Sequence, residues 1–104
     1  MTALATHLAA FLREHLPRER NVSPHTVTTY ANCFALLVRF AANHLKRRPT
    51  DLTIEDFDPA LIMAFLDHSE EARKNSPRTR NARLAAIRAF FRYVEYRVPA
   101  CLDL

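Results

Sequence analysis

The stretch SPRTRNARLAAIRAFFRYVEY, residues 76–96, joins the clearest helix start in the chain to its densest positive charge. Ser76 can accept a hydrogen bond from a free amide of a first helical turn, and Pro77 suits the first helical position, where no amide donor is needed. At 100° per residue, five apolar side chains gather on one arc: Leu84, Ile87, Phe90, Phe91 and Val94. The stretch therefore predicts an amphipathic helix that packs one side into a core.

The far side of this expected helix carries long polar side chains. Four of them form a stripe: Arg78, Asn81, Arg88 and Arg92. Small residues stand beside it, where a bulky partner can approach the backbone: Ala82, Ala85 and Ala89. The stripe favours a polyanion as partner, with two alternatives. It can be a solvated surface, or the arginine face of a helical protein-interaction module that binds an acidic partner.

The whole chain has 104 residues and a formal charge of +4, from 15 basic and 11 acidic side chains. This length predicts one domain with one core. The charge is unevenly spread, because residues 51–71 hold seven acids and no Lys or Arg, whereas residues 73–97 hold eight Lys or Arg and one acid. We therefore expect a polarised surface with an anionic partner.

The sequence lacks the residues that several classes of function require. The chain has no glycine, which P-loops and dinucleotide fingerprints need where backbone approaches phosphate. Its two cysteines, Cys33 and Cys101, stand in no C-x-x-C pattern, so no disulfide framework or zinc site is indicated. The apolar run Leu8 to Leu12 is too short for a membrane span or a signal peptide. We expect no cofactor, no metal, no membrane and a cytoplasmic location.

Three further helices are expected. The first covers residues 3–16 and stops at Pro17; the second runs from Ser23-Pro24 to about residue 45, with a wide apolar arc that makes it central. A short turn at residues 53–56 precedes a third helix over residues 60–71, which begins after Asp58-Pro59. Its outward acids, Asp67, Glu70 and Glu71, place it away from any nucleic acid. No strand pattern competes, so the fold class is all-α, and Pro99 should end regular structure before an apolar tail that resembles a cut end.

Five pieces of this sequence, in this order, carry a resemblance. They are Ser23-Pro-His-Thr-Val-Thr-Thr-Tyr30, Leu52-Thr-Ile-Glu-Asp-Phe57, Phe65-Leu66, Ser76-Pro-Arg-Thr79 and Leu84-Ala-Ala-Ile-Arg-Ala-Phe-Phe-Arg-Tyr93. Together they resemble the N-terminal core-binding domain of tyrosine recombinases, the phage-integrase family. The resemblance covers nearly the whole chain, and residues 1–104 are expected to form a single core-binding domain. It implies a SAM-like bundle of four to five helices that grips recombination-site DNA, while a separate catalytic domain, absent here, cuts DNA with a tyrosine nucleophile.

The resemblance also implies which residues contact double-stranded DNA. The starts of the second and fourth helices should approach the major groove, with these matching positions: Ser23, His25, Thr26, Thr29, Ser76, Arg78, Thr79, Arg80, Asn81 and Arg83. We add Arg88 from the stripe. Helix N-termini offer free amides and a partial positive charge, so most contacts should go to phosphate, with one or two of Arg78, Arg80 and Asn81 reading base edges. Arg80 and Arg83 should reach DNA past the edge of the bundle.

The residues that could be taken for catalytic groups are interpreted as chance matches to a motif. His15-x-x-Arg18 and His44-x-x-Arg47 match a spacing used in the family's active site, and Tyr93 or Tyr96 could be offered as nucleophile. Both pairs fall at the ends of expected helices in a domain that resembles the non-catalytic half. This fragment is therefore predicted not to be an enzyme, although its parent is predicted to be a tyrosine recombinase.

The first helix has two interpretations. In the family this region often contacts a neighbouring protomer of a recombination tetramer, and His7, Ala9 and Ala10 leave a fairly smooth second face. A helix that merely closes the bundle is the alternative.

Overall fold

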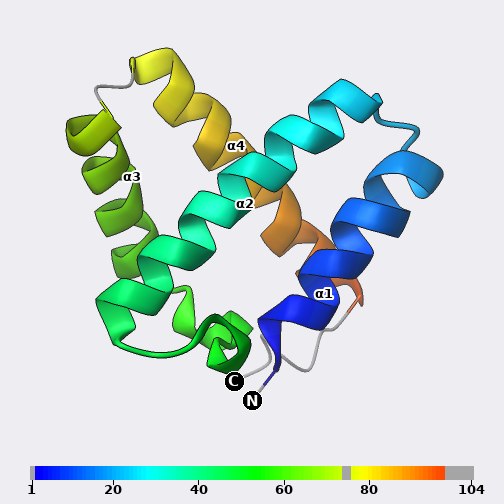
Figure 1. Cartoon of the computed structure of the whole chain (residues 1–104). Helices are drawn as coiled ribbons and strands as arrows, with labels where there is room; N and C mark the ends of the chain where they lie inside the picture. Colours follow the sequence, from blue (N-terminus) through cyan, green and yellow to red (C-terminus); the bar gives the residue numbers. More distant parts are fainter. Residues whose placement is uncertain (1, 74–75, 98–104) are drawn as a thin grey trace.

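The fold is a bundle of four helices joined by short turns, seen in a computed structural model that describes residues 2–73 and 76–97 (Figure 1). The elements in chain order are α1 Leu4–Ala10, the π-helix η1 Phe11–Glu19, α2 Pro24–Leu45, the single turns η2 Pro49–Asp51 and η3 Ile54–Asp56, α3 Pro59–Arg73 and α4 Pro77–Arg97. The described part of the chain has no strand, only one isolated bridge between Ala3 and Thr53. The all-α prediction is confirmed; the expectations for Pro99, the tail and Cys101 lie outside the described residues.

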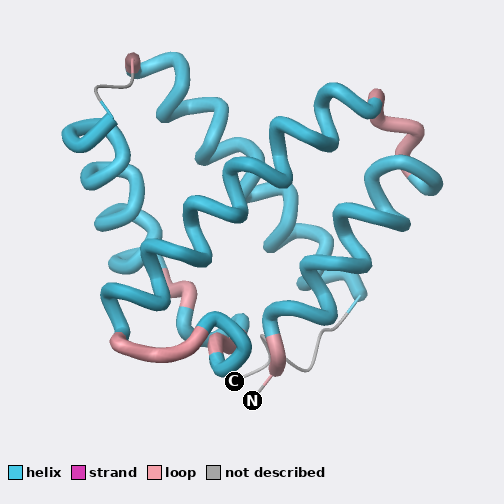
Figure 2. The backbone as a smooth tube through the Cα atoms, in the orientation of Figure 1, coloured by secondary structure: helices cyan, strands magenta, loops and turns pink. Residues whose placement is uncertain are grey.

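The two longest helices, α2 and α4, cross one another (Figure 1). Their N-terminal halves diverge toward the top of the view, where α3 accompanies α4 on one side and the π-helix accompanies α2 on the other. Short loops join the π-helix to α2 and α2 to α3 (Figure 2). The helices thus form two pairs, α3 with the first half of α4 and the π-helix with the first half of α2, which meet where α2 and α4 cross.

Each of the three expected cap-plus-proline starts is present. Ser23 Oγ accepts from the Thr26 amide at 3.2 Å, and Ser76 Oγ accepts from the Thr79 amide at 3.2 Å. Asp58 Oδ1 accepts from the Leu61 amide at 2.8 Å. These contacts lie within four residues of chain, which explains why the sequence alone predicts where α2, α3 and α4 begin.

The first helix does not stop at Pro17, so that prediction is wrong. It continues as a π-helix through Glu19, where wider turns accommodate a residue without an amide donor. The π-helix ends at Glu19, and two residues later the φ of 51° at Asn21 lets the Val22 amide donate to the Leu16 carbonyl at 2.8 Å. The extra turn carries Glu19 and Arg20 alongside α4.

The buried face of α4 differs in part from the predicted arc. Ile87, Phe90 and Val94 are buried as expected, but Leu84 and Phe91 are only partly buried. Ala86 and Tyr93 are buried in addition. The arc is shifted because α4 packs on both α2 and α3, whereas a helical wheel assumes one neighbour.

The core is centred on the ring of Phe11, which is 1% exposed. Four aromatic rings from α2 and α4 have centroids within 5.3 to 6.4 Å of it: Tyr30, Phe34, Phe90 and Tyr93. Such offset and edge-to-face contacts add to the free energy gained by removing the rings from water. Phe11 therefore holds the π-helix against both crossing helices.

We expect Phe11→Ala to lower the free energy of unfolding by about 3 to 5 kcal/mol, because the cavity would lie between three elements that cannot close on it together. Urea denaturation followed by circular dichroism measures the change. Met63→Ala is the control, since the Met63 side chain is 50% exposed on α3 and its loss should change stability little. Equal losses in both variants would contradict the central place of Phe11.

Candidate nucleic-acid interface

The polar stripe on α4 is exposed as the sequence predicts. Arg78, Asn81, Arg88 and Arg92 all face solvent. The row from Arg78 to Arg92 covers roughly 21 Å at 1.5 Å per residue. Within residues 2–73 and 76–97, none of the ion pairs uses its three arginines. The row therefore presents cations whose charge no nearby carboxylate of the described chain neutralises.

A hollow of about 710 Å³ lies beside this row, between the π-helix, the start of α2 and the second half of α4. Its walls carry three arginines, one from the π-helix end and two from α4: Arg20, Arg88 and Arg92. Aromatic side chains line it too: Phe11, His15, Tyr30, Tyr93 and Tyr96. No Asp or Glu is among its lining residues. The hollow thus combines positive charge with flat apolar surface.

The predicted contacts at the start of α2 are partly engaged with one another. Ser23 Oγ donates to Thr26 Oγ1 at 3.0 Å, and Thr29 Oγ1 donates to the His25 carbonyl at 3.0 Å. Ser23, His25 and Thr29 are exposed, while Thr26 is partly buried. The Ser23 and Thr29 hydroxyls each use their hydrogen in these bonds, whereas Thr26 Oγ1 accepts one and can still donate its own hydrogen, and the exposed His25 ring can also donate to an anion.

At the start of α4 the same pattern recurs. The hydroxyls of Ser76 and Thr79 lie 3.3 Å apart, and the Ser76 side chain caps the first turn by accepting from the Thr79 amide. Arg78 and Asn81 project to solvent from this turn and the next. These two side chains, with the free amides of the helix start, form the outer end of the polar stripe.

Arg80 and Arg83 are turned toward α3, which differs from the expectation that they extend past the bundle edge. Arg80 Nη1 lies 2.8 Å from both Asp67 Oδ1 and Glu70 Oε2, with the side chain 22% exposed. Arg83 Nη1 donates to Ser69 Oγ. The bonds to Asp67 and Glu70 raise the pKa of Arg80. Their place in DNA binding stays a prediction.

The acidic side of α3 also lies closer to the arginines than expected. Asp67 and Glu70, which were expected to point outward, bind Arg80 in the first turn of α4. The physical reason is that α3 and α4 pack side by side, so a carboxylate that would repel phosphate is neutralised by an arginine instead. Glu71 stays exposed to solvent.

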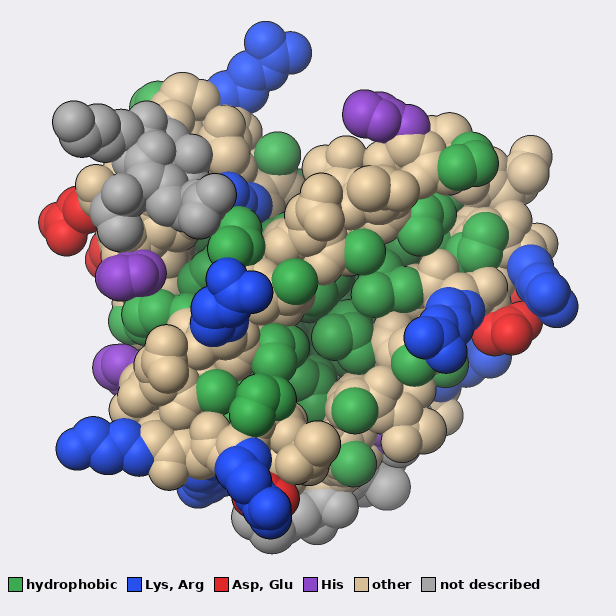
Figure 3. Space-filling view, in the orientation of Figure 1, with side chains coloured by type: hydrophobic (Ala, Val, Ile, Leu, Met, Phe, Trp, Pro, Cys, Tyr) green, Lys and Arg blue, Asp and Glu red, His purple; other side chains and the backbone are tan. Residues whose placement is uncertain are grey.

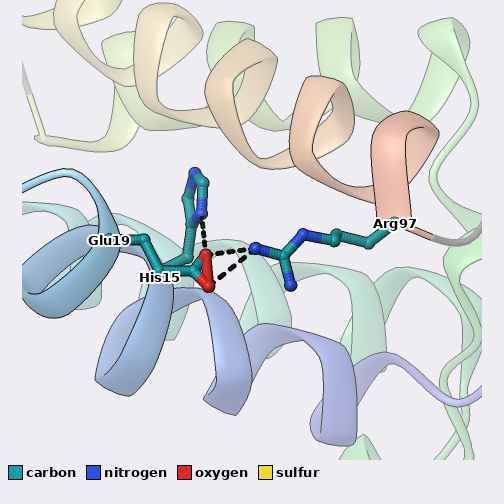
Figure 4. A network of polar contacts seen from close by, with 3 residues as sticks. All are labelled: His15, Glu19 and Arg97. Carbon is teal, nitrogen blue, oxygen red and sulfur yellow. Dashed lines mark hydrogen bonds and ion pairs between the residues drawn. The ribbon is translucent and has the colours of Figure 1, made fainter.

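A polar clasp joins the end of the π-helix to the end of α4 (Figure 4). Glu19 Oε1 lies 2.8 Å from His15 Nδ1, and Arg97 Nη2 donates to both oxygens of Glu19, with 2.7 Å to Oε2. The Arg97 guanidinium also stands 5.5 Å from the centre of the Tyr93 ring. These bonds, that from Arg97 first and that from His15 second, lower the pKa of Glu19 to about 2. The clasp therefore keeps this carboxylate charged and paired.

The two His-x-x-Arg segments do not share a common arrangement, and in neither of them do the His and the Arg contact the same partner among the residues that the structure describes. His15 contacts Glu19 while Arg18 pairs with Glu14 at 3.5 Å. In the second pair, His44 stacks on Phe40 with 5.2 Å between ring centres, whereas Arg47 binds Asp56 at 2.8 Å. Each member thus has a separate structural contact. Searches of the described residues find no cluster of three potential metal-binding side chains and no helix with the length and hydropathy to cross a membrane.

Comparison with known proteins decides the family. A family profile described as "Phage integrase, N-terminal SAM-like domain" matches residues 8–97, which is most of the chain. The chain belongs to the phage integrase family, as an N-terminal SAM-like domain. No solved structure gives a significant match to this integrase domain.

Three relatives support the assignment. The domain is 45% identical over 97 residues to the integrase/recombinase y4rD of Sinorhizobium fredii (strain NBRC 101917 / NGR234), covering 93% of this chain and 34% of that protein. It is 41% identical over 97 residues to y4rC of the same organism, covering 93% and 29%. To tyrosine recombinase XerC of Pelobacter propionicus (strain DSM 2379 / NBRC 103807 / OttBd1) it is 37% identical, covering 90% and 29%. The chain spans about a third of the length of these relatives.

Sequence reasoning about the integrase domain did not single out Arg20 or the hollow. Arg20 is far from Arg88 and Arg92 in the chain and becomes their neighbour only because the π-helix continues past Pro17. Arg92 was in the stripe but not among the residues expected to bind DNA. Nothing in local spacing indicates that Tyr30 and Tyr96 line one hollow.

The clasp predicts a pH dependence. Since the pKa of the Glu19 carboxyl falls from its usual 4.5 to about 2 on folding, its stabilisation is complete above about pH 4.5 and is lost as the pH falls toward 2. The difference in unfolding free energy between wild type and Glu19→Gln should shrink over this range, as measured by urea denaturation at a series of pH values. Glu14→Gln is the control, because its exposed ion pair should contribute little at any pH. A constant difference for Glu19→Gln would contradict the clasp.

Proposed function

We propose that this integrase domain grips duplex DNA through the starts of α2 and α4, so that a separate catalytic domain of the same parent protein can cut and rejoin strands. The recombination reaction is then the parent's, and this fragment contributes binding alone. The observation that carries the proposal is the row of exposed arginines on α4, whose charges no carboxylate of the described chain neutralises.

The geometry suits a phosphate backbone. The N-terminal halves of α2 and α4 diverge from the crossing, so two helix starts with free amides can approach a duplex at separate points (Figure 1). Arg78, Arg88 and the hydroxyls of the two caps supply phosphate contacts, which fix register without reading sequence. Arg78 and Asn81 stand farthest out on α4 and are the best placed to reach base edges in the major groove.

Contacts with a neighbouring protomer are a second part of the proposal. A hollow of about 350 Å³ lies between α1, α2 and η2, lined mainly by apolar side chains that include Leu8, Leu12 and Val38. The space-filling view shows hydrophobic side chains gathered between α1 and α2, with Lys and Arg around them (Figure 3). An apolar surface with a charged rim is the usual composition of a protein–protein interface. A cytoplasmic location accords with DNA as the partner.

A helical interaction module that binds an acidic protein is the competing function. The same arginine row supports it, since guanidinium groups bind carboxylates as well as phosphates. Binding to heparin would not distinguish DNA binding from binding of an acidic protein. Direct competition between duplex DNA and a Glu-rich peptide distinguishes these two functions.

The test is a fluorescence-anisotropy titration of the chain on duplex DNA at several salt concentrations. Wild type should bind with an affinity that falls steeply with salt, and Arg78→Ala should make the slope of log K against log [salt] shallower by about 0.9, the value for one lost phosphate contact. Arg18→Ala is the matched control, because Arg18 is exposed but lies on the π-helix, away from the α4 arginines, where it is paired with Glu14. A Glu-rich peptide that binds where duplex DNA does not would sink the proposal in favour of the acidic-partner function.

A further inference from the structure

We propose that the hollow between the π-helix and α4 holds the sugar–phosphate backbone of one strand of the bound duplex, with Arg20 from the end of the π-helix and Arg92 from α4 as phosphate ligands. This inference rests on the proposed function and adds to it a second contact surface, separate from the two helix starts. The surface is built from segments that meet only in the folded chain: the end of the π-helix with the loop after it, Tyr30 of α2, and α4 from Ala85 to Tyr96.

The charge of the hollow is the first reason. Three arginines line it and no carboxylate does. The nearest acid in sequence to Arg20 is Glu19, and the clasp holds its two oxygens against Arg97 and His15. Glu95 lies on α4 but is not among the lining residues. An anion entering the hollow therefore meets guanidinium groups without a competing carboxylate on its walls.

The exposure of the lining side chains is the second reason. Arg20, Arg88, Arg92 and Tyr96 all face solvent, and Tyr96 is 83% exposed. A site for a small ligand normally encloses most of the ligand surface among buried groups. Cations that stand on open walls instead suit a polymer that runs through the hollow and leaves at both sides.

Continuity with the stripe is the third reason. Arg88 and Arg92 are one helical turn apart on the same face of α4 as Arg78, so the row leads directly from the start of α4 into the hollow. Its roughly 21 Å corresponds to about six base-pair steps of one strand. Arg20 then supplies a cation from a second element, the end of the π-helix. Tyr30 and Tyr96 offer aromatic surface on which a deoxyribose can pack, with hydroxyls that can bond phosphate.

The test compares two double variants in the same salt-dependent anisotropy titration. Arg20→Ala with Arg92→Ala should make the slope of log K against log [salt] shallower by about 1.8, as expected for two lost phosphate contacts, and by the same amount on duplexes of different sequence. The charge-matched control is Arg13→Ala with Arg39→Ala, two exposed arginines that line other hollows and should leave the slope unchanged. Thermal unfolding should be alike for both, because all four side chains are exposed.

The outcomes separate this inference from the proposed function. If wild type binds duplex DNA and the Arg20/Arg92 variant keeps the wild-type slope, the hollow is not a backbone site while DNA gripping stands. Equal changes of the salt slope in both double variants would mean that only the overall charge of the protein matters, which would overturn the inference. If wild type binds no duplex at any salt concentration, the proposed function itself fails. Loss of Glu-rich peptide binding in the Arg20/Arg92 variant, with duplex binding intact, would assign the hollow to an acidic protein partner.

Discussion

The ring of Phe11 is the contact on which the rest of this structure depends. It belongs to the π-helix, and its aromatic neighbours come from both α2 and α4, so one side chain fixes three elements at their crossing. Since that crossing sets where the two helix starts diverge, the spacing of the proposed DNA contacts follows from an apolar contact at the centre of the bundle. The hollow has the same origin, because Phe11 and Tyr93 form part of its lining.

Around this core, five of the six arginines of α4 fall into two groups with different electrostatic surroundings, while the sixth, Arg83, donates to the Ser69 hydroxyl. Arg80 and Arg97 are paired with carboxylates of α3 and the π-helix, where they join one element to another. Arg78, Arg88 and Arg92 face solvent without such partners in the described part of the chain. A charged pair contributes to the packing of helices and little to the external field, whereas an unpaired row contributes mainly to that field. The same residue type thus has a structural role on one face of α4 and a proposed binding role on the other.

Prediction from the sequence succeeded where the cause is local. The starts of α2, α3 and α4 depend on a cap and a proline within four residues, and all three were located correctly. Exposure of the α4 stripe followed from helical periodicity. Prediction was wrong at Pro17, because the usual cost of proline inside a helix is avoided by the wider π turn. It was incomplete for Arg80 and Arg83, whose directions depend on how close α3 packs.

The sequence by itself determined the helical class, the helix starts, the polarity of charge and, through its resemblance, the phage integrase family. Each of these features depends on a short-range pattern of residues or on the order of residues along the chain. Only the tertiary structure decided which arginines are paired, that Glu19 is held by Arg97, and that Arg20 and Arg92 line one hollow. Those facts join residues far apart in the chain, and their positions are set by the packing of helices around Phe11, which no local spacing encodes.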